Sequence, residues 1–145
     1  MNKTGEYRFT IVVPVYNEVD NIYALEKALT GYLPHSKYKA CALFVNDGSS
    51  DGSLDRIREV CARNNDLYYI SFVRNAGLSA AIKAGFDYTC SDYVGYMDAD
   101  LQTTPEDFNL LLDGIEQKSM MIGIRASRKD TFFKRIQSKI ANGFR

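Results

Sequence analysis

The amino-acid sequence predicts an α/β protein, a Rossmann-like three-layer sandwich around a mostly parallel central sheet. Short apolar runs alternate with segments whose apolar residues recur every three or four positions. This is the pattern of strands alternating with amphipathic helices, which gives a parallel sheet covered on both faces. The chain has 145 residues, 46% of them hydrophobic, as expected for one domain with its own core.

The predicted strands and helices alternate along the whole chain. Strands are expected at Phe9–Val13, Cys41–Val45, Leu67–Val73, Tyr93–Met97 and Met120–Ile124. Apolar helix faces are expected at Ile22, Leu25, Leu29 and Tyr32, at Leu54, Ile57 and Cys61, at Ile82, Phe86 and Cys90, at Phe108, Leu111, Leu112 and Ile115, and at Phe132, Ile136 and Ile140. Thr104, Pro105 and Asp107 form a capping-box pattern that predicts a helix starting at Pro105.

The charge is unevenly divided, although the whole chain is formally neutral. Residues 1–124 hold 11 Lys and Arg against 17 Asp and Glu, whereas residues 125–145 hold seven Lys and Arg against Asp130 alone. We therefore expect a core over residues 1–124, followed by a basic segment that meets an anionic partner. The alternative is a solvated helix that packs on the domain through its apolar residues.

Cysteine usage and the apolar runs bear on location and partners. Cys41, Cys61 and Cys90 form no Cys-x-x-Cys pair, so they are expected to fill the core and to form neither a disulfide framework nor a zinc site. No apolar run reaches the ~18–20 residues that a membrane-spanning helix needs. The N-terminus lacks a secretory cleavage pattern, so a cytoplasmic location is expected. No nucleic-acid partner is expected.

Two carboxylates follow the fourth predicted strand, in Asp98-Ala99-Asp100. In an extended chain they point the same way, about 6–7 Å apart. Two anions held together repel, and a divalent cation relieves the repulsion. Mg²⁺ suits one or two carboxylates completed by phosphate oxygens and water, and Gln102 offers a further neutral oxygen. The alternative is a helix cap and a turn former.

Asp47 stands directly after the second predicted strand, in Asn46-Asp47-Gly48-Ser49-Ser50-Asp51-Gly52. A carboxylate at this place is able to accept the ring N–H of uracil or guanine, so we expect Asp47 to recognise a nucleotide base. For Ser50 and Asp51 we favour a turn that caps the next helix. Neither a Walker A motif nor Gly-x-Gly-x-x-Gly after the first strand is present, which argues against kinases, GTPases and dehydrogenases.

These motifs resemble those of family 2 glycosyltransferases with the GT-A fold. The resemblance lies in Val12-Val13-Pro14-Val15-Tyr16-Asn17-Glu18, Val45-Asn46-Asp47-Gly48-Ser49-Ser50-Asp51-Gly52 and Asp98-Ala99-Asp100-Leu101-Gln102. Within the family, the chain resembles polyprenyl-phosphate glycosyltransferases such as dolichol-phosphate mannose synthase and undecaprenyl-phosphate glucosyltransferase. The resemblance covers nearly the whole chain and identifies residues 1–124 as a nucleotide-sugar-binding GT-A core.

The resemblance also implies roles for individual residues. The nucleotide would be bound by Pro14, Tyr16, Glu18, Asp47, Arg74, Asn75 and Ala99. Asp98 and Asp100 would be catalytic and, with Gln102, would hold Mg²⁺ or Mn²⁺. Asn46 replaces the Asp of many relatives, which favours UDP over GDP. Family members that glycosylate a hydroxyl usually carry a later general base and a Gln-x-x-Arg-Trp motif, and this chain, which has no Trp, lacks both.

A polyprenyl phosphate needs no such base, because a phosphate monoester with a second pKa of ~6 is already anionic at neutral pH. The expected activity is therefore inverting transfer of a hexose from a UDP-sugar to polyprenyl phosphate at the inner face of the membrane. Arg125, Arg128, Lys129, Lys134 and Arg135 would attract the lipid phosphate and the membrane surface. Residues 125–145 would begin an acceptor region that continues past Arg145. The alternatives are a hydroxyl-directed polysaccharide transferase with a saccharide acceptor, and a nucleotide-sugar-binding module without turnover.

Overall fold

A computed structural model describes residues 6–123 of the chain. The elements are β1 (Phe9–Val15), α1 (Ile22–Tyr32), η2 (Leu33–His35), β2 (Ala40–Asn46), α2 (Ser53–Arg63), β3 (Leu67–Ser71), α3 (Leu78–Tyr88), β4 (Tyr93–Tyr96), α4 (Asp107–Gly114) and η3 (Ile115–Gln117). The final basic helix, and with it Arg125, Arg128 and Arg135, lies outside the described residues.

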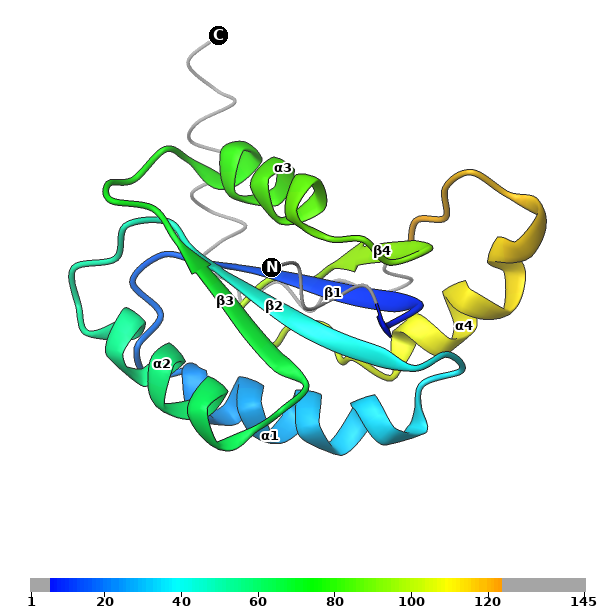
Figure 1. Cartoon of the computed structure of the whole chain (residues 1–145), viewed down its shortest axis with the longest axis horizontal. Coiled ribbons are helices and arrows are strands. Elements are labelled where there is room, and N and C mark those ends of the chain that lie inside the picture. The colour runs from blue at the N-terminus through cyan, green and yellow to red at the C-terminus, as the bar shows by residue number, and fades with distance from the viewer. Residues whose placement is uncertain (1–5, 124–145) are drawn as a thin grey trace, which may run out of the picture.

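The four described strands form one parallel sheet in the order β3-β2-β1-β4 (Figure 1). β1 and β2 lie in the middle and pair from Phe9 opposite Ala40 to Val15 opposite Asn46. Every residue of these two strands is buried. Continuous apolar strands of this kind are typical of a parallel sheet with both faces covered, so the predicted parallel sheet is confirmed.

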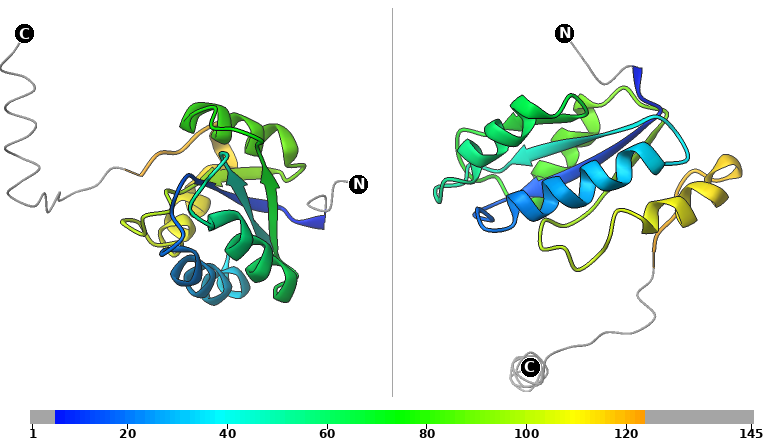
Figure 2. Two further views of the ribbon diagram at one scale, coloured as in Figure 1. Left: turned by 90° about the vertical axis from the view of Figure 1, so that its left-hand side faces the viewer. Right: turned by 90° about the horizontal axis from the view of Figure 1, so that it is seen from below.

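Helices cover both faces of the sheet (Figures 1 and 2), with α1 and α2 on one face and α3 on the other. The larger core lies on the α1 side and also includes residues of α4; among its members are Ile11, Phe44, Ile22, Leu25, Ile57 and Phe108. The smaller core, under α3, consists of Val12, Leu43, Val45 and Ala81, with four partly buried neighbours. The three-layer sandwich expected from the sequence is confirmed.

The expected apolar face of α3 was wrong. Phe86 is 43% exposed and Cys90 lies beyond the helix end, whereas Ala81 and Gly85 are the buried positions. A Cβ on Gly85 would lie 2.4 Å from Val12 Cγ1, so the missing side chain lets α3 approach the sheet closely. The periodicity placed the largest apolar residues inward, but the small residues make the contact.

Two further predictions fail near the end of the described range. Residues 120–123 form no strand, and Met120 and Ile122 are exposed. A strand exists through hydrogen bonds to a neighbour, and among the described residues β4 pairs with β1 alone. The helix expected from Pro105 begins instead at Asp107, after a turn, and no side chain caps it.

Other expectations hold more fully. The α1 stripe is buried at each expected position, and Phe108 and Leu112 of α4 are buried while Leu111 and Ile115 pack against the core. Cys41 is buried and Cys61 partly so, but the exposed Cys90 does not fill the core. None of the helices in residues 6–123 has the length and hydropathy to span a membrane.

Candidate nucleotide-sugar site

A proline opens the sheet at the place where the motif loops meet. β1 pairs with β2 as far as Val15, but its pairing with β4 stops at Val12. The Met97 N–H donates to the Val12 carbonyl, and the next β1 nitrogen facing β4 belongs to Pro14, which has no N–H to donate. The chain after β4 is therefore released from β1 just before Asp98.

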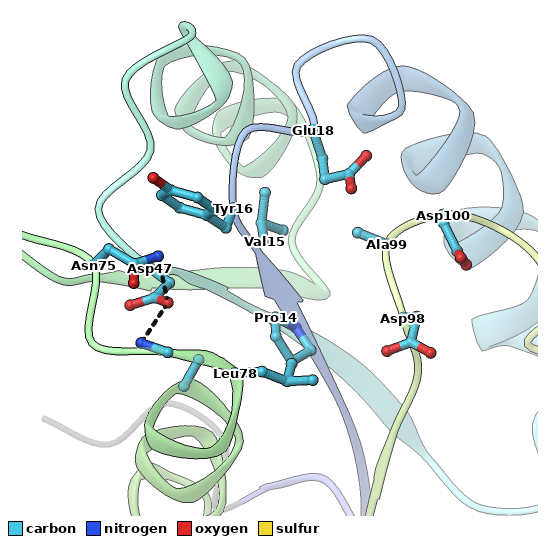
Figure 3. Close-up of a pocket in the computed structure, with 12 residues that line it drawn as sticks. Pro14, Val15, Tyr16, Glu18, Asp47, Asn75, Leu78, Asp98, Ala99 and Asp100 are labelled. Atoms are coloured by element: carbon cyan, nitrogen blue, oxygen red, sulfur yellow. Dashed lines mark hydrogen bonds between the residues drawn. The ribbon is translucent and has the colours of Figure 1, made fainter. Parts of the chain in front are cut away.

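A cavity of about 310 Å³ lies in this opening, beyond the carboxyl ends of the strands (Figure 3). Its volume is at the lower end of small-molecule sites. The residues that line it come from four strand ends and from the start of α3; they are Pro14, Val15, Tyr16, Glu18, Asp47, Asn75, Gly77, Leu78, Ala81, Asp98, Ala99 and Asp100.

Most of the site residues expected from the sequence meet in this cavity. The eight that line it are Pro14, Tyr16, Glu18, Asp47, Asn75, Asp98, Ala99 and Asp100. Arg74 and Gln102 do not line it. The sequence reasoning missed Val15, Gly77, Leu78 and Ala81. A Gly directly before a helix pattern is the one signal that pointed to the α3 start, because a positive φ such as the +94° of Gly77 favours glycine.

Hydrogen bonds join the loop after β1 to the loop after β2. The backbone N–H groups of Asn17, Glu18 and Val19 donate to side-chain oxygens of Ser49, Ser53 and Asp51, each at 3.0 Å. In return the Ser50 N–H donates to Asn17 Oδ1 at 2.9 Å. Asn17 has a φ of 54°, in the left-handed region that Asn tolerates better than most residues. These bonds hold the two loops as one rim.

Asp51 forms the Asx turn that leads into α2, as the sequence suggested, although the N-cap residue Gly52 supplies no side-chain cap. Its Oδ1 accepts hydrogen bonds from the Ser53 N–H and hydroxyl, while Oδ2 accepts the Val19 N–H. Burial by itself would raise the pKa of this carboxyl, but the hydrogen bonds from Ser53 and Val19 outweigh it and lower the pKa below its usual value.

Asp47 joins the same rim to the loop before α3. Its side chain is buried, with 3% of the residue exposed. Oδ1 accepts the Ala76 N–H at 2.7 Å. Oδ2 accepts the Gly77 N–H at 2.9 Å and a hydrogen bond from Asn75 Nδ2 at 3.0 Å, on the side of the cavity drawn in Figure 3. The carboxylate lies in the cavity as expected, but three donors of its own chain already bind it.

The two carboxylates after β4 lie on the other side of the cavity (Figure 3). Asp98 and Asp100 are exposed and the intervening Ala99 is buried, which is the alternation expected of an extended stretch. Leu101 then turns the chain with a φ of 55°, a costly conformation for a bulky residue that concentrates at functional sites. Asp100 Oδ1 accepts the Gln102 N–H at 3.1 Å.

The charge of the cavity lining decides what it can bind. Four carboxylates line it, from Glu18, Asp47, Asp98 and Asp100, and no Lys or Arg among the described residues does. Such a surface repels a diphosphate unless a cation neutralises it. Within residues 6–123 no group of three metal-ligating side chains occurs. A pair of exposed carboxylates instead fits a cation that keeps water and takes its remaining ligands from phosphate oxygens.

A wider hollow of about 630 Å³ lies at the opposite, amino ends of the strands. It is lined mainly by tyrosines and by residues near the end of α2, including Tyr7, Tyr68, Tyr69 and Tyr88. None of the strand-end motifs contributes to it. Because ligands of parallel sheets bind at the carboxyl ends of the strands, the smaller cavity is the candidate site.

The sequence of this chain matches a known protein family. The family model described as "Glycosyl transferase family 2" matches residues 10–144. The chain belongs to glycosyl transferase family 2. The predicted family is therefore confirmed. The matched range also includes every residue that lines the cavity.

Curated relatives of this family 2 chain include sugar transferases named for undecaprenyl phosphate. The undecaprenyl-phosphate 4-deoxy-4-formamido-L-arabinose transferase of Aeromonas hydrophila is 35% identical over 98% of this chain and 44% of its own length. The uncharacterised glycosyltransferase YkcC of Bacillus subtilis is 38% identical over 88% of this chain and 40% of its own length. The chain thus spans less than half the length of the relatives that it matches.

Solved structures share the fold of this family 2 chain. A mannosyltransferase from Pyrobaculum calidifontis, in complex with GDP-Man and Mn²⁺, aligns over 65% of this chain and 28% of its own with a TM-score of 0.55 at 23% identity. S. aureus TarS aligns over 73% of this chain and 19% of its own with a TM-score of 0.57 at 20% identity. At these identities the likeness shows the fold alone, and that fold is the expected GT-A fold.

Proposed function

We propose that this chain forms the donor-binding part of an inverting glycosyltransferase that moves a hexose from a nucleotide sugar, with UDP-sugars favoured, to polyprenyl phosphate. The observation that carries the proposal is the cavity itself. The loops after β1, β2 and β3, which are joined by hydrogen bonds, lie on one side of it, and the Asp98 and Asp100 carboxylates lie on the other. No basic side chain of the described residues lines it. A nucleoside diphosphate with a bound cation fits these two sides, with its base on the side of the loops and its cation beside the carboxylates.

Each side of the cavity supports one part of the donor. Tyr16 is 49% exposed beside Pro14 and offers a ring face to the base. Asp98 and Asp100 would hold Mg²⁺ or Mn²⁺ with Gln102 close by, and the bound ion would neutralise charge on the leaving diphosphate. The complex of the Pyrobaculum mannosyltransferase with GDP-Man and Mn²⁺ supports a divalent metal in this fold.

The proposed reaction needs no general base from the protein. An oxygen of the acceptor phosphate attacks the anomeric carbon, its bond to the sugar forms, and the bond from that carbon to the diphosphate oxygen breaks. The nucleoside diphosphate leaves with the electron pair, and in-line attack inverts the anomeric configuration. The protein contributes alignment, since correct orientation alone removes a large part of such a barrier.

The acceptor class rests on the relatives and on the basic segment. The Aeromonas relative is named for undecaprenyl phosphate. Arg125, Arg128 and Arg135 supply cationic side chains in a region rich in Lys and Arg, which we propose meets the lipid phosphate at the cytoplasmic membrane face.

Calorimetry tests the donor part of the proposal. UDP and GDP, free and sugar-linked, are titrated into the protein in Mn²⁺ and then in EDTA. UDP binding that requires Mn²⁺ supports the proposal, and equal affinity in EDTA contradicts the assignment of the metal.

Transfer of radiolabelled sugar tests the acceptor part, with the protein made at its natural length in membranes that contain polyprenyl phosphate. Label in the lipid fraction is expected. The change of Arg128→Ala with Arg135→Ala should lower lipid labelling more than donor affinity. Labelling of free saccharides instead of lipid would favour the hydroxyl acceptor.

A further inference from the structure

We infer that the outer edge of β3 is an interaction surface for a second copy of this chain, whose β3 pairs with it antiparallel to join the two sheets into one. β3 is the outermost strand on its side of the sheet (Figure 1). An edge strand presents unpaired backbone groups, which are a template for another strand. The inference concerns assembly and goes beyond the proposed sugar transfer.

The backbone bonds at the two ends of β3 show which of its residues face outward. The Asp66 carbonyl and the Phe72 N–H both bond to β2. Because backbone groups of a paired strand point alternately toward and away from its neighbour, those of Leu67, Tyr69 and Ser71 point away from β2. In the part of the chain that the structure describes, the Tyr69 and Ser71 N–H groups and the carbonyls of all three residues make no backbone hydrogen bond.

β3 lacks the features that usually protect an edge strand. Charged side chains, prolines and bulges serve that purpose. Leu67–Ser71 contains no charged residue and no proline, and its register with β2 is continuous. Its five residues are a typical strand length. Tyr69, at the midpoint, is 40% exposed, and tyrosine is enriched at protein interfaces. The strand is therefore suited to pairing with a further strand.

A second copy fits this edge because antiparallel pairing about Tyr69 is symmetric. A two-fold axis at the midpoint of the strand sets Leu67 opposite the partner's Ser71 and uses all the outward groups of both copies. Tyr69 then exchanges two N–H···O=C bonds with the partner's Tyr69, as in a hydrogen-bonded antiparallel pair. The edge is thus complementary to itself.

The charges beside the two edges of the sheet also favour β3 for this pairing. Asp66 precedes β3 and Arg74 follows it, and both are exposed. Antiparallel pairing brings Asp66 near the partner's Arg74 at both ends of the joined strands, where opposite charges attract. β4, the other edge within residues 6–123, is preceded by Asp92 and followed by Asp98. Pairing of β4 with itself would bring like charges together.

Sedimentation equilibrium of this chain is the main test, and we expect a dimer whose population rises with concentration. Tyr69→Lys should raise the dissociation constant by about 10-fold or more, because the two-fold axis sets the introduced charges directly opposite each other. Tyr96→Lys is the matched control, since Tyr96 is 47% exposed and its backbone faces outward from β4; it should leave the dissociation constant unchanged. Equal constants for the two variants overturn the inference. So does an unmodified chain that stays monomeric, which would leave the edge to an extended peptide of another protein.

Amide hydrogen exchange of the unmodified chain, followed by NMR at low and high protein concentration, gives a second test that needs no variant. The Tyr69 and Ser71 N–H groups should exchange about 10-fold more slowly in the dimer, because the partner strand accepts them. The Tyr68 and Ile70 N–H groups bond to β2 and should exchange slowly at both concentrations. Exchange that does not depend on concentration contradicts the inference, and protection that rises at Tyr96 instead moves the interface to β4.

Discussion

The two sides of the cavity are built in opposite ways. On one side, which we call the tied side, residues 16–19, 46–53 and 75–77 are joined by hydrogen bonds from backbone N–H groups to side-chain oxygens. On the other, which we call the carboxylate loop (residues 98–102), Asp98 makes no hydrogen bond or ion pair within the described residues. The protein holds the tied side by its own contacts and leaves carboxylate oxygens available for a ligand on the other. From this difference we propose that the tied side binds the base and that the carboxylate loop binds the diphosphate through a metal ion.

The largest expected effect comes from removing a charge in the carboxylate loop. Asp100→Asn should weaken UDP binding in Mn²⁺ by at least about 100-fold, because even changes behind the ligands of a metal site cost about 10- to 100-fold. Asp113→Asn, an exposed carboxylate of α4 paired with Lys37, is the control and should bind normally. Calorimetry with UDP provides the measurement. Normal metal-dependent affinity in Asp100→Asn would remove the carboxylate loop from the diphosphate site.

The next effect concerns the close approach of α3, the helix that follows the tied side, to the sheet. Gly85→Ala should lower the free energy of unfolding by about 1–3 kcal/mol, because the new Cβ overlaps Val12 in a packed core. Gly31→Ala, in α1 with nothing within 4 Å of its Cβ, should instead be neutral or stabilising by about 0.5 kcal/mol. Urea denaturation of both variants checks the pair. Equal stabilities would show that α3 does not need its close approach.

Hydrogen exchange compares the two sides directly in the unmodified protein. Without ligand, the amides of Glu18, Val19 and Ala76 should exchange about 10-fold more slowly than those of Ala99 and Leu101. Mn²⁺ with UDP should then slow exchange more in the carboxylate loop than on the tied side. The comparison breaks if both sides exchange alike without ligand.

The smallest expected effect is a pH dependence at Asp51. Its pKa in the folded protein lies below the usual value, so its contribution to stability is present above the unfolded pKa of ~3.9 and is lost as pH falls through the folded pKa. Asp51→Asn should therefore destabilise the protein at pH 7 and much less in acid. The difference at pH 7 should stay below about 1 kcal/mol, because this exposed carboxylate is screened by water. Urea denaturation at both pH values, with Asp55→Asn as control, measures it.

The sheet and the carboxylate pair were readable from the sequence because their signals are local. β1 and β2 are continuous apolar runs, and Asp98 and Asp100 follow a strand directly. Parallel pairing then brings strand ends together without further information. Eight expected residues meet in the cavity for this reason.

The parts that sequence reasoning missed depend on distances between elements. The inward face of α3 is set by Gly85 fitting against Val12, a contact between residues far apart in the chain. The three bonds to Asp47 likewise arise from a loop 28–30 residues away. Periodicity ranks residues by size and polarity, so it favoured Phe86 over the small residues that make the contact. The contribution of Leu78 and Ala81 to the cavity follows from the same packing.

The direction of the hydrogen bonds on the tied side also governs which mutations the protein tolerates. The donors are backbone N–H groups, as at Val19 and Ala76, and the acceptors are the side chains of Asp47, Asp51 and Ser53. Every residue except proline carries that donor, so positions 19 and 76 can vary widely among related sequences while positions 47, 51 and 53 accept few replacements. In a saturation library the donor positions should reject proline selectively. Among related sequences, the position that donates each bond should vary more than the position that accepts it.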